Sequence, residues 1–293
     1  MHYRDQAEQL RNIIKQQNQI HVPNAKVLTI TSGKGGVGKS NTAVNLAIWF
    51  RKRGKRVIIF DADFGLANVE VMFGTVPTYS LKDVIYGDRQ VSEIITKGPM
   101  DIGFISGGSG IVALNDLSRI QIGEVIASLS VLNELTDILI IDTGAGVGST
   151  VMDIVLASPE VVLVTTPEPS SLTDSYSLVK TLYKHPGFVP GATNIHLLAN
   201  RVSSREEADA LYEKLNSIVR RFLEGEMSYL GMVPQDAALE KAVRAQQIIS
   251  LTAPSGRASR AYESIVDKLL AEENGIQFKW GIAQFFQRFT RNR

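Results

Sequence analysis

Short runs of apolar and β-branched residues alternate with amphipathic stretches along most of the chain. A short apolar run between turn residues is typical of a buried strand, whereas apolar positions three or four residues apart are typical of a helix. We expect strands at 27–31, 56–61, 102–106, 138–142, 161–165, 195–200 and 227–233. We expect helices over 41–53, 116–132, 172–184, 205–223 and 257–272.

Several of the expected strands are apolar at nearly every position, as happens when helices cover both faces of a parallel sheet. Strands that alternate with helices indicate an α/β fold. We therefore predict a doubly wound, mostly parallel sheet with helices on both faces. In such a sheet the ligand binds at the carboxyl ends of the strands.

The two ends of the chain differ from this core. Residues 1–23 form a polar arm with only a weak apolar stripe, and an aromatic and basic segment follows Asn274. We therefore divide the chain into an arm (1–23), an α/β domain (24–273) and a tail (274–293).

Composition narrows the class of protein. The chain has 293 residues, of which 44% are hydrophobic, and a net charge of +1, so no global field favours nucleic acid. It has no cysteine, which excludes iron–sulfur clusters, thiolate zinc sites and thiol nucleophiles. The first residues are polar and lack a secretory signal, and no apolar run reaches the ~20 residues of a membrane-spanning helix. A cytoplasmic protein is the default expectation.

A glycine-rich loop lies between the first expected strand and the first expected helix. Strand, glycine loop and helix in this order are the context of a phosphate-binding loop, whose backbone amides and helix N-terminus face an anion. Lys39 would reach the β- and γ-phosphates, and the Ser40 hydroxyl would face Mg²⁺. Lys34 is a second cation, which an ordinary phosphate-binding loop does not need. The alternative is that Lys34 merely adds positive charge to its own loop. The loop residues are Gly33, Lys34, Gly35, Gly36, Val37, Gly38, Lys39 and Ser40.

Carboxylates follow two other expected strands. Asp61 and Asp63 end one strand, and Asp142 ends another, just before Gly144 and Gly146. Phosphoryl transfer to water needs a metal and a group that orients the nucleophile, and carboxylates near a phosphate loop suit both tasks. The alternatives are a solvated turn for the aspartate pair and an ordinary tight turn for the glycines.

Three motifs carry a family resemblance. Residues 34–40 resemble the deviant Walker A motif of the MinD/ParA branch of P-loop ATPases, and residues 61–68 and 142–146 resemble its two switches. The resemblance covers about 26–270. It implies a MinD-like P-loop NTPase fold, ATP and ADP as ligands with Mg²⁺, and an ATP-dependent homodimer.

The resemblance also implies roles for single residues. Lys34 would contact the phosphates bound by the other subunit, Asp63 would position the attacking water, and Asp61 and Asp142 would support the metal. Asn41 would extend the phosphate contacts of the loop. The nucleotide base would lie near Asn200, Arg201, Pro234 and Asp236; the alternatives are a structural turn for Pro234 and a helix N-cap for Asp236.

The tail is amphipathic when placed on a helix. Aromatic and aliphatic side chains fall on one face, with basic residues beside them, as in interfacial membrane helices. The alternative is a final helix packed on the protein's own core, and both hold if the helix is stored in one state and released in another. The expected membrane residues are Phe278, Lys279, Ile282, Phe285, Phe286, Arg288 and Phe289.

The arm contains a short motif with Asp5, Gln6, Leu10 and Arg11, which resembles the N-terminal motif of the FlhG (YlxH) group. That resemblance implies control of flagellar number and placement, stimulation of the signal-recognition-type GTPase FlhF, contact with flagellar C-ring proteins, and peripheral binding to the inner face of the membrane. It implies no specific nucleic acid.

Several alternatives remain at this stage. For the arm, the alternative is a terminus without function. For the whole chain, the alternatives are a DNA-partitioning ATPase of the ParA type, a cell-division MinD, or a nucleotide-binding scaffold that does not hydrolyse ATP.

Overall fold

The computed structural model describes residues 25–63, 68–107, 118–189, 191–273 and 281–291. These residues form one eight-stranded sheet with the strand order β3-β4-β2-β5-β1-β6-β7-β8. All strand pairs are parallel except β3 with β4. The strands are β1 (Lys26–Ser32), β2 (Val57–Ala62), β3 (Thr96–Lys97), β4 (Gly103–Ser106), β5 (Ile138–Ala145), β6 (Glu160–Thr165), β7 (Asn194–Val202) and β8 (Ser228–Pro234).

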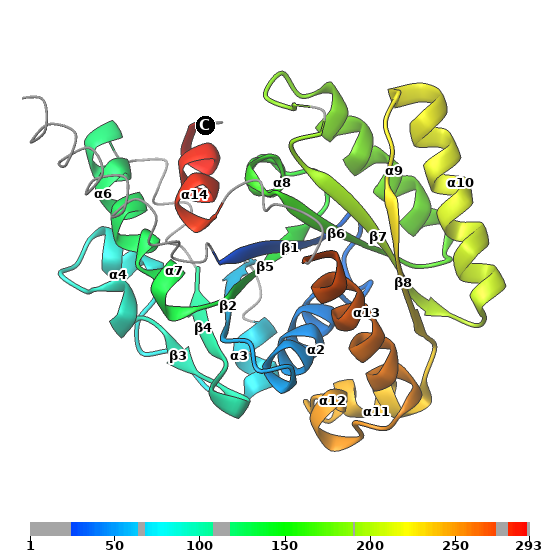
Figure 1. The fold of residues 1–293 in the computed structure, drawn as a ribbon, viewed down its shortest axis with the longest axis horizontal. Helices are drawn as coiled ribbons and strands as arrows, with labels where there is room; N and C mark the ends of the chain where they lie inside the picture. The colour runs from blue at the N-terminus through cyan, green and yellow to red at the C-terminus, as the bar shows by residue number, and fades with distance from the viewer. Residues whose placement is uncertain (1–24, 64–67, 108–117, 190, 274–280, 292–293) are drawn as a thin grey trace, which may run out of the picture.

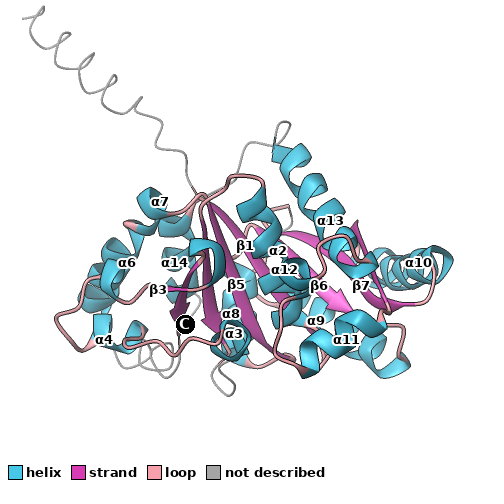
Figure 2. Ribbon diagram, turned by 90° about the horizontal axis from the view of Figure 1, so that it is seen from below, coloured by secondary structure: helices cyan, strands magenta, loops and turns pink. Residues whose placement is uncertain are grey.

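Helices cover both faces of this sheet (Figures 1 and 2), which confirms the predicted doubly wound α/β class. One face carries α2 (Lys39–Lys52), α3 (Asn68–Phe73), α11 (Ala237–Arg244), α12 (Ile249–Thr252) and α13 (Arg257–Glu273). The other carries α4 (Leu81–Ile85), α6 (Arg119–Ser130), α7 (Leu132–Leu135), α8 (Ser149–Ala157), α9 (Pro169–Lys184), α10 (Arg205–Leu223) and α14 (Ile282–Arg291). Two 3₁₀ turns, Val91–Glu93 and Pro99–Asp101, lie near the β3 edge.

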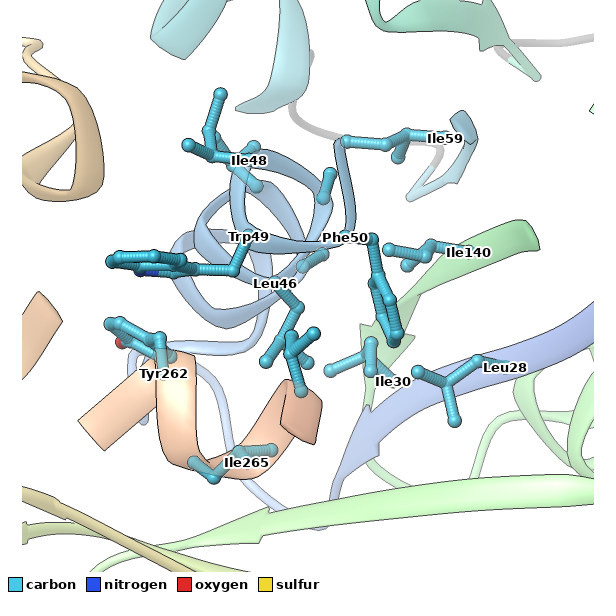
Figure 3. Close-up of a cluster of buried hydrophobic side chains, with 14 of the residues drawn as sticks. Leu28, Ile30, Leu46, Ile48, Trp49, Phe50, Ile59, Ile140, Tyr262 and Ile265 are labelled. Atoms are coloured by element: carbon cyan, nitrogen blue, oxygen red, sulfur yellow. The ribbon is translucent and has the colours of Figure 1, made fainter. Parts of the chain in front are cut away.

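Alternation along the central strands divides the core into two layers. On β2, Ile59 faces α2 while Ile58 and Phe60 face the opposite layer. The α2 layer is continuous from β1 and β5 to α13 (Figure 3), where Phe50 and Tyr262 are fully buried. Because both faces of these strands are buried, their sequences read as unbroken apolar runs.

The central strand β1 leads directly into the glycine loop and then into α2. Its neighbours β5 and β6 lie on opposite sides, so the carboxyl ends of β1, β2 and β5 meet at one edge of the sheet. This edge is where an open α/β sheet binds its ligand.

Candidate functional site

The glycine loop occupies residues 33–38, between β1 and the first residue of α2. Gly36 and Gly38 have positive φ angles of 76° and 101°, which only glycine adopts without strain. Gly33 is required for a different reason, because a Cβ at this position would lie 2.2 Å from the backbone oxygen of Asp174 on α9. The loop therefore has the backbone freedom and close packing that an anion cradle needs.

Asn200 holds the loop from the end of β7. Its side-chain amide donates a hydrogen bond to the Val37 carbonyl at 2.7 Å, and a Cβ on Gly38 would lie 2.4 Å from the same nitrogen. Asn200 was predicted as a contact of the nucleotide base. In this structure it positions the phosphate loop, and its contact with the base remains a prediction.

Lys39, the first residue of α2, is only 7% exposed. Burial lowers its pKa, and the nearby charges of Asp142 and Asp63 partly oppose that shift. A buried lysine ammonium that faces two carboxylates is the cation one expects to gain most from a bound phosphate.

Asp61 and Asp142 are register partners on the neighbouring strands β2 and β5. Burial raises the pKa of each carboxyl to about 7. Asp61 accepts hydrogen bonds from the backbone amides of Asp63 at 3.1 Å and Val69 at 3.3 Å, and these partly offset the shift.

Asp142 has no such support. Its side chain is fully buried, and neither carboxylate oxygen accepts a hydrogen bond of normal geometry from the described residues, although the nearby Ser40 hydroxyl lowers the pKa somewhat. An unpaired buried carboxylate is costly unless a cation joins it. Asp142, Asp61 and the Ser40 hydroxyl together offer the hard oxygen atoms that Mg²⁺ prefers.

These oxygens do not form a complete metal site by themselves. Among the described residues no cluster of three or more His, Asp and Glu side chains could hold a metal ion. Mg²⁺ is commonly held by one or two carboxylates together with substrate phosphates. The residues at this edge fit that mode, in which the nucleotide supplies the remaining ligands.

Asp63 is half-buried just beyond β2. The Asn68 side-chain amide lies 3.4 Å from its carboxylate, and a Cβ on Gly144 would lie 3.8 Å from the Asp63 Oδ1 atom. The structure thus brings the two predicted switch segments together at Asp63 and Gly144. Residues 64–67 of the first switch lie outside the described residues.

Lys34 turns away from its own loop. Its ammonium donates to the Glu168 carboxylate at 3.1 Å and to the Ser170 hydroxyl at 2.6 Å, both at the start of α9. Sequence reasoning missed Glu168 and Ser170. The one available signal was their position just after the apolar run that forms β6.

The four residues predicted near the base meet at the carboxyl ends of β7 and β8. Pro234 pairs with Val202, and Arg201 has a φ of 56° with its amide donating to Asn200. The Asp236 carboxylate accepts from the Ala238 amide at 2.8 Å and the Ala258 amide at 3.1 Å. Asp236 therefore caps α11 and braces the start of α13, as the N-cap alternative expected, and its contact with the base is untested.

The side chain of Asn41, which follows Ser40, also has hydrogen-bond partners within the protein. The Asn41 side-chain oxygen accepts hydrogen bonds from Asn45 at 2.9 Å and from the Tyr262 hydroxyl at 3.3 Å. These contacts fix the first turn of α2 against α13. The predicted phosphate contact of Asn41 stays a prediction.

Comparison with known proteins assigns this geometry to a family. The sequence model of a family described as "ParA: NUBPL iron-transfer P-loop NTPase" matches residues 24–270. The chain belongs to the ParA family of P-loop NTPases. As a member of its MinD-like branch the protein is an ATPase. The family description mentions iron transfer, but this chain has no cysteine and therefore cannot bind iron through thiolates.

Two relatives are similar over most of the chain. The chain is 37% identical to the antiactivator FleN of Pseudomonas aeruginosa, over 87% of this chain and 89% of FleN. It is 35% identical to the flagellum site-determining protein YlxH of Helicobacter pylori, over 92% and 90% of the two chains. The septum site-determining protein MinD of Pyrococcus horikoshii, solved with Mg-ADP, has the same fold, with a TM-score of 0.66, 24% identity, and coverage of 86% and 100%.

The ParA-family domain is followed by α14, whose amphipathic character the sequence predicted. Its apolar side chains are buried against α6 and α8, and the Arg288 guanidinium lies 3.4 Å from the Leu156 carbonyl of α8. In this structure the helix is therefore packed on the protein's own core, which was the alternative to membrane binding. Four of its side chains are at most 2% exposed: Ile282, Phe285, Phe286 and Phe289.

Other predicted residues cannot be placed. Phe278 and Lys279 of the tail, and Asp5, Gln6, Leu10 and Arg11 of the arm, lie outside the described residues. Within the part that the structure describes, no helix is both long enough and apolar enough to cross a membrane.

Proposed function

We propose that this ParA-family ATPase is an ATP-dependent switch that controls the number and placement of flagella. The flagellar role is supported by the flagellum site-determining protein YlxH, which is similar over about nine-tenths of the chain. The switch is supported by one observation above all. In the single chain Lys34, the second lysine of the loop, contacts Glu168 and Ser170 at the surface. Because these contacts are exposed, Lys34 can exchange them for a group of another subunit.

In the nucleotide-bound state, the amides of residues 33–38 and the Lys39 ammonium would hold the phosphates, and Asn200, Arg201, Pro234 and Asp236 would surround the base. Ser40, Asp61 and Asp142 would hold Mg²⁺, which neutralises phosphate charge when bound. Asp63 would orient the attacking water from its position beside Gly144. A bound cation would favour the ionised form of Asp142, whose charge is costly to bury without a partner.

ATP would complete the site across a homodimer. Lys34 would leave Glu168 and bind the phosphates held by the partner subunit, so the dimer would persist while the γ-phosphate is present. The exchange is feasible because the Lys34–Glu168 pair is solvent-exposed, and exposed pairs contribute about 0–1 kcal/mol.

Dimerisation would also release the tail. With α14 free, the aromatic face including Phe278 and the basic Lys279 and Arg288 would bind an anionic membrane surface, which places the protein peripherally on the cytoplasmic side. We divide the chain accordingly into an arm (1–23), the ATPase domain (24–273) and a membrane-targeting tail (274–293). The arm would stimulate the GTPase FlhF, and flagellar C-ring proteins would be further partners.

Size-exclusion chromatography with ADP and with ATP tests this function on the full chain. We expect a monomer with ADP, a dimer with ATP, and an Asp63→Ala variant that binds ATP but stays dimeric because hydrolysis fails. A Lys34→Ala variant should bind nucleotide and remain monomeric. An Asp63→Ala protein that stays monomeric with ATP, where the unaltered chain dimerises, would contradict the mechanism.

Membrane binding is tested separately by flotation of liposomes that contain anionic lipid. ATP should raise the bound fraction, and deletion of residues 275–293 should abolish it without preventing dimerisation. Binding of duplex DNA with ATP, in place of liposomes, would instead favour the DNA-partitioning alternative. Unchanged liposome binding after the deletion would refute the role of the tail.

A further inference from the structure

A basic groove of about 590 Å³ lies at the outer edge of the sheet, between β8, the start of α10 and the first half of α13. β8 is the last strand on this side, and among the described residues it pairs only with β7. We propose that this groove binds an extended acidic segment of a partner protein, which adds alongside β8. The proposal concerns a surface separate from the phosphate loop.

Three arginines give the groove its charge. Arg205, Arg257 and Arg260 line it, and all three are exposed. The Arg205 guanidinium lies 3.7 Å from the Asp209 carboxylate, while Arg257 and Arg260 form no ion pair with any described residue. The described residues that line the groove thus include three guanidinium groups and no carboxylate.

The placement of these arginines is not explained by stability. Each lies in the first turn of a helix, where a cation is unfavourable by a few tenths of a kcal/mol or more. Residues that break a local stability rule without a structural partner are candidates for binding. Guanidinium groups bind carboxylates through two parallel hydrogen bonds, so acidic side chains are their natural ligands.

The floor of the groove is largely apolar. Tyr229, Met232 and Ile265 line it with apolar surface, and Gly231 has a φ of 155° at an irregularity in the β7–β8 register. The Lys268 ammonium donates to the Tyr229 carbonyl, which covers one rung of the edge. Lysine side chains commonly protect an exposed strand edge from pairing. A bound acidic segment would draw the Lys268 ammonium away from the Tyr229 carbonyl and free that carbonyl for pairing.

Other occupants fit less well. Residues 1–23 carry Arg4, Arg11 and Lys15 against Asp5 and Glu8, so the chain's own arm is not acidic. A second copy that paired β8 with β8 about a two-fold axis would bring the same arginines together. Nucleic acid would gain little from the apolar floor, and the whole chain has a net charge of only +1.

The groove also stays accessible in the proposed membrane-bound state. It lies at the β8 edge of the sheet beside α10 and α13, whereas α14 packs on α6 and α8 (Figure 1), so the two surfaces do not overlap. Pro234 lines the groove and leads into Asp236, which ties α11 to α13. A segment bound here would therefore lie next to the region predicted to hold the base.

Fluorescence anisotropy on the full chain tests the proposal with a labelled peptide of about ten residues that alternates glutamate and valine. We expect saturable binding, at least tenfold weaker binding to an Arg257→Gln/Arg260→Gln variant, and unchanged binding to an Arg221→Gln/Arg244→Gln variant. Arg221 and Arg244 are exposed arginines outside the groove and serve as the matched control. A lysine–valine peptide and a glutamate–valine peptide with alternate amides methylated should both fail to bind.

Four results would overturn the proposal. They are no saturation up to about 1 mM peptide, equal losses in the two arginine variants, equal binding of the methylated peptide, and tighter binding of duplex DNA that is lost in the Arg257→Gln/Arg260→Gln variant. The last result would reassign the groove to nucleic acid. Far-UV circular dichroism and thermal unfolding of both variants establish that each is folded.

Discussion

Phe286 of α14 packs edge-on against Phe60 of β2, with ring centroids 6.0 Å apart and ring planes at 75°. Phe60 immediately precedes Asp61, the register partner of Asp142. The tail helix therefore rests on the strand that carries a predicted magnesium carboxylate. A shift of β2 at the nucleotide site would therefore move Phe60 and disturb its packing against α14.

This contact predicts the effect of Phe60→Ala. Loss of a buried phenyl ring should lower the free energy of unfolding by about 3–5 kcal/mol and loosen α14, because the ring packs against it. The substitution leaves the apolar face of the tail intact. We expect a several-fold larger liposome-bound fraction in ADP than for the unaltered chain, measured by flotation.

Phe104→Ala is the matched control. Phe104 is equally buried on β4 and makes a similar edge contact with Phe73, but on the α2 side of the sheet. It should lose comparable stability without gaining liposome binding. If both variants bind liposomes equally in ADP, general destabilisation is the cause and the coupling through Phe60 is wrong.

The Lys34 contacts predict that Glu168→Gln favours dimerisation. The variant removes a carboxylate that competes with phosphate for the same ammonium, and the pair is exposed, so overall stability should change by less than about 1 kcal/mol. The concentration of protein needed for half-maximal dimerisation in ATP should fall by up to about fivefold. Analytical ultracentrifugation measures this directly.

Glu224→Gln supplies the comparison for this experiment, since Glu224 is exposed at the end of α10, away from the loop. It should dimerise as the unaltered chain does. An unchanged or weakened dimer in Glu168→Gln would mean that Glu168 does not restrain Lys34.

The loop geometry predicts that alanine lowers stability at Gly33 but not at Gly35. Gly33→Ala would place a Cβ within 2.1 Å of the Asp174 backbone carbon, whereas nothing lies within 4 Å of a Cβ at Gly35. Overpacking should cost the nucleotide-free protein about 1–3 kcal/mol in Gly33→Ala, and Gly35→Ala should be nearly neutral. Chemical unfolding without nucleotide tests this, and equal stabilities would show that the loop yields at Gly33 without cost.

Local sequence patterns predicted the fold well because most strands are compact apolar runs, whereas the two-residue strand β3 is polar and was not predicted. The strand expected at 138–142 is longer, Ile138–Ala145, because Thr143 and Ala145 continue the ladder with Ala62 and Ser32. The helix expected over 116–132 is shorter, with α6 at Arg119–Ser130. α8 was not predicted, although Val151–Ala157 is apolar apart from Asp153 and is buried throughout.

The site was predictable only where its chemistry is local. The residues of the phosphate loop are contiguous, and each aspartate lies at the end of an apolar run, so each of these patterns is visible without a structure. The Lys34–Glu168 contact joins residues 134 positions apart, and Asp236 reaches Ala258 across 22 positions. Such pairs depend on strand order and helix docking, which composition and periodicity do not encode.

The raised pKa values of Asp61 and Asp142 predict how stability depends on pH. An unfolded aspartate has a pKa of about 3.9, whereas these two have a pKa of about 7 in the folded chain. Between these values the folded state binds more protons than the unfolded state, so the free energy of unfolding without nucleotide should fall as pH rises from about 4 to 7. The total loss should be on the order of a few kcal/mol, and it should level off above the folded pKa.

Asp142→Asn isolates this term, because asparagine keeps the shape of the side chain and cannot ionise. The variant should have a shallower decline in stability between pH 5 and about 8, and at about pH 8 it should be more stable than the unaltered chain without nucleotide. It should also lose the additional stabilisation that Mg-ADP gives the unaltered chain, since that gain requires the ionised carboxylate. Thermal unfolding across this pH range, with and without Mg-ADP, checks both expectations. A variant with the same pH slope as the unaltered chain would show that Asp142 is already ionised when the protein is folded.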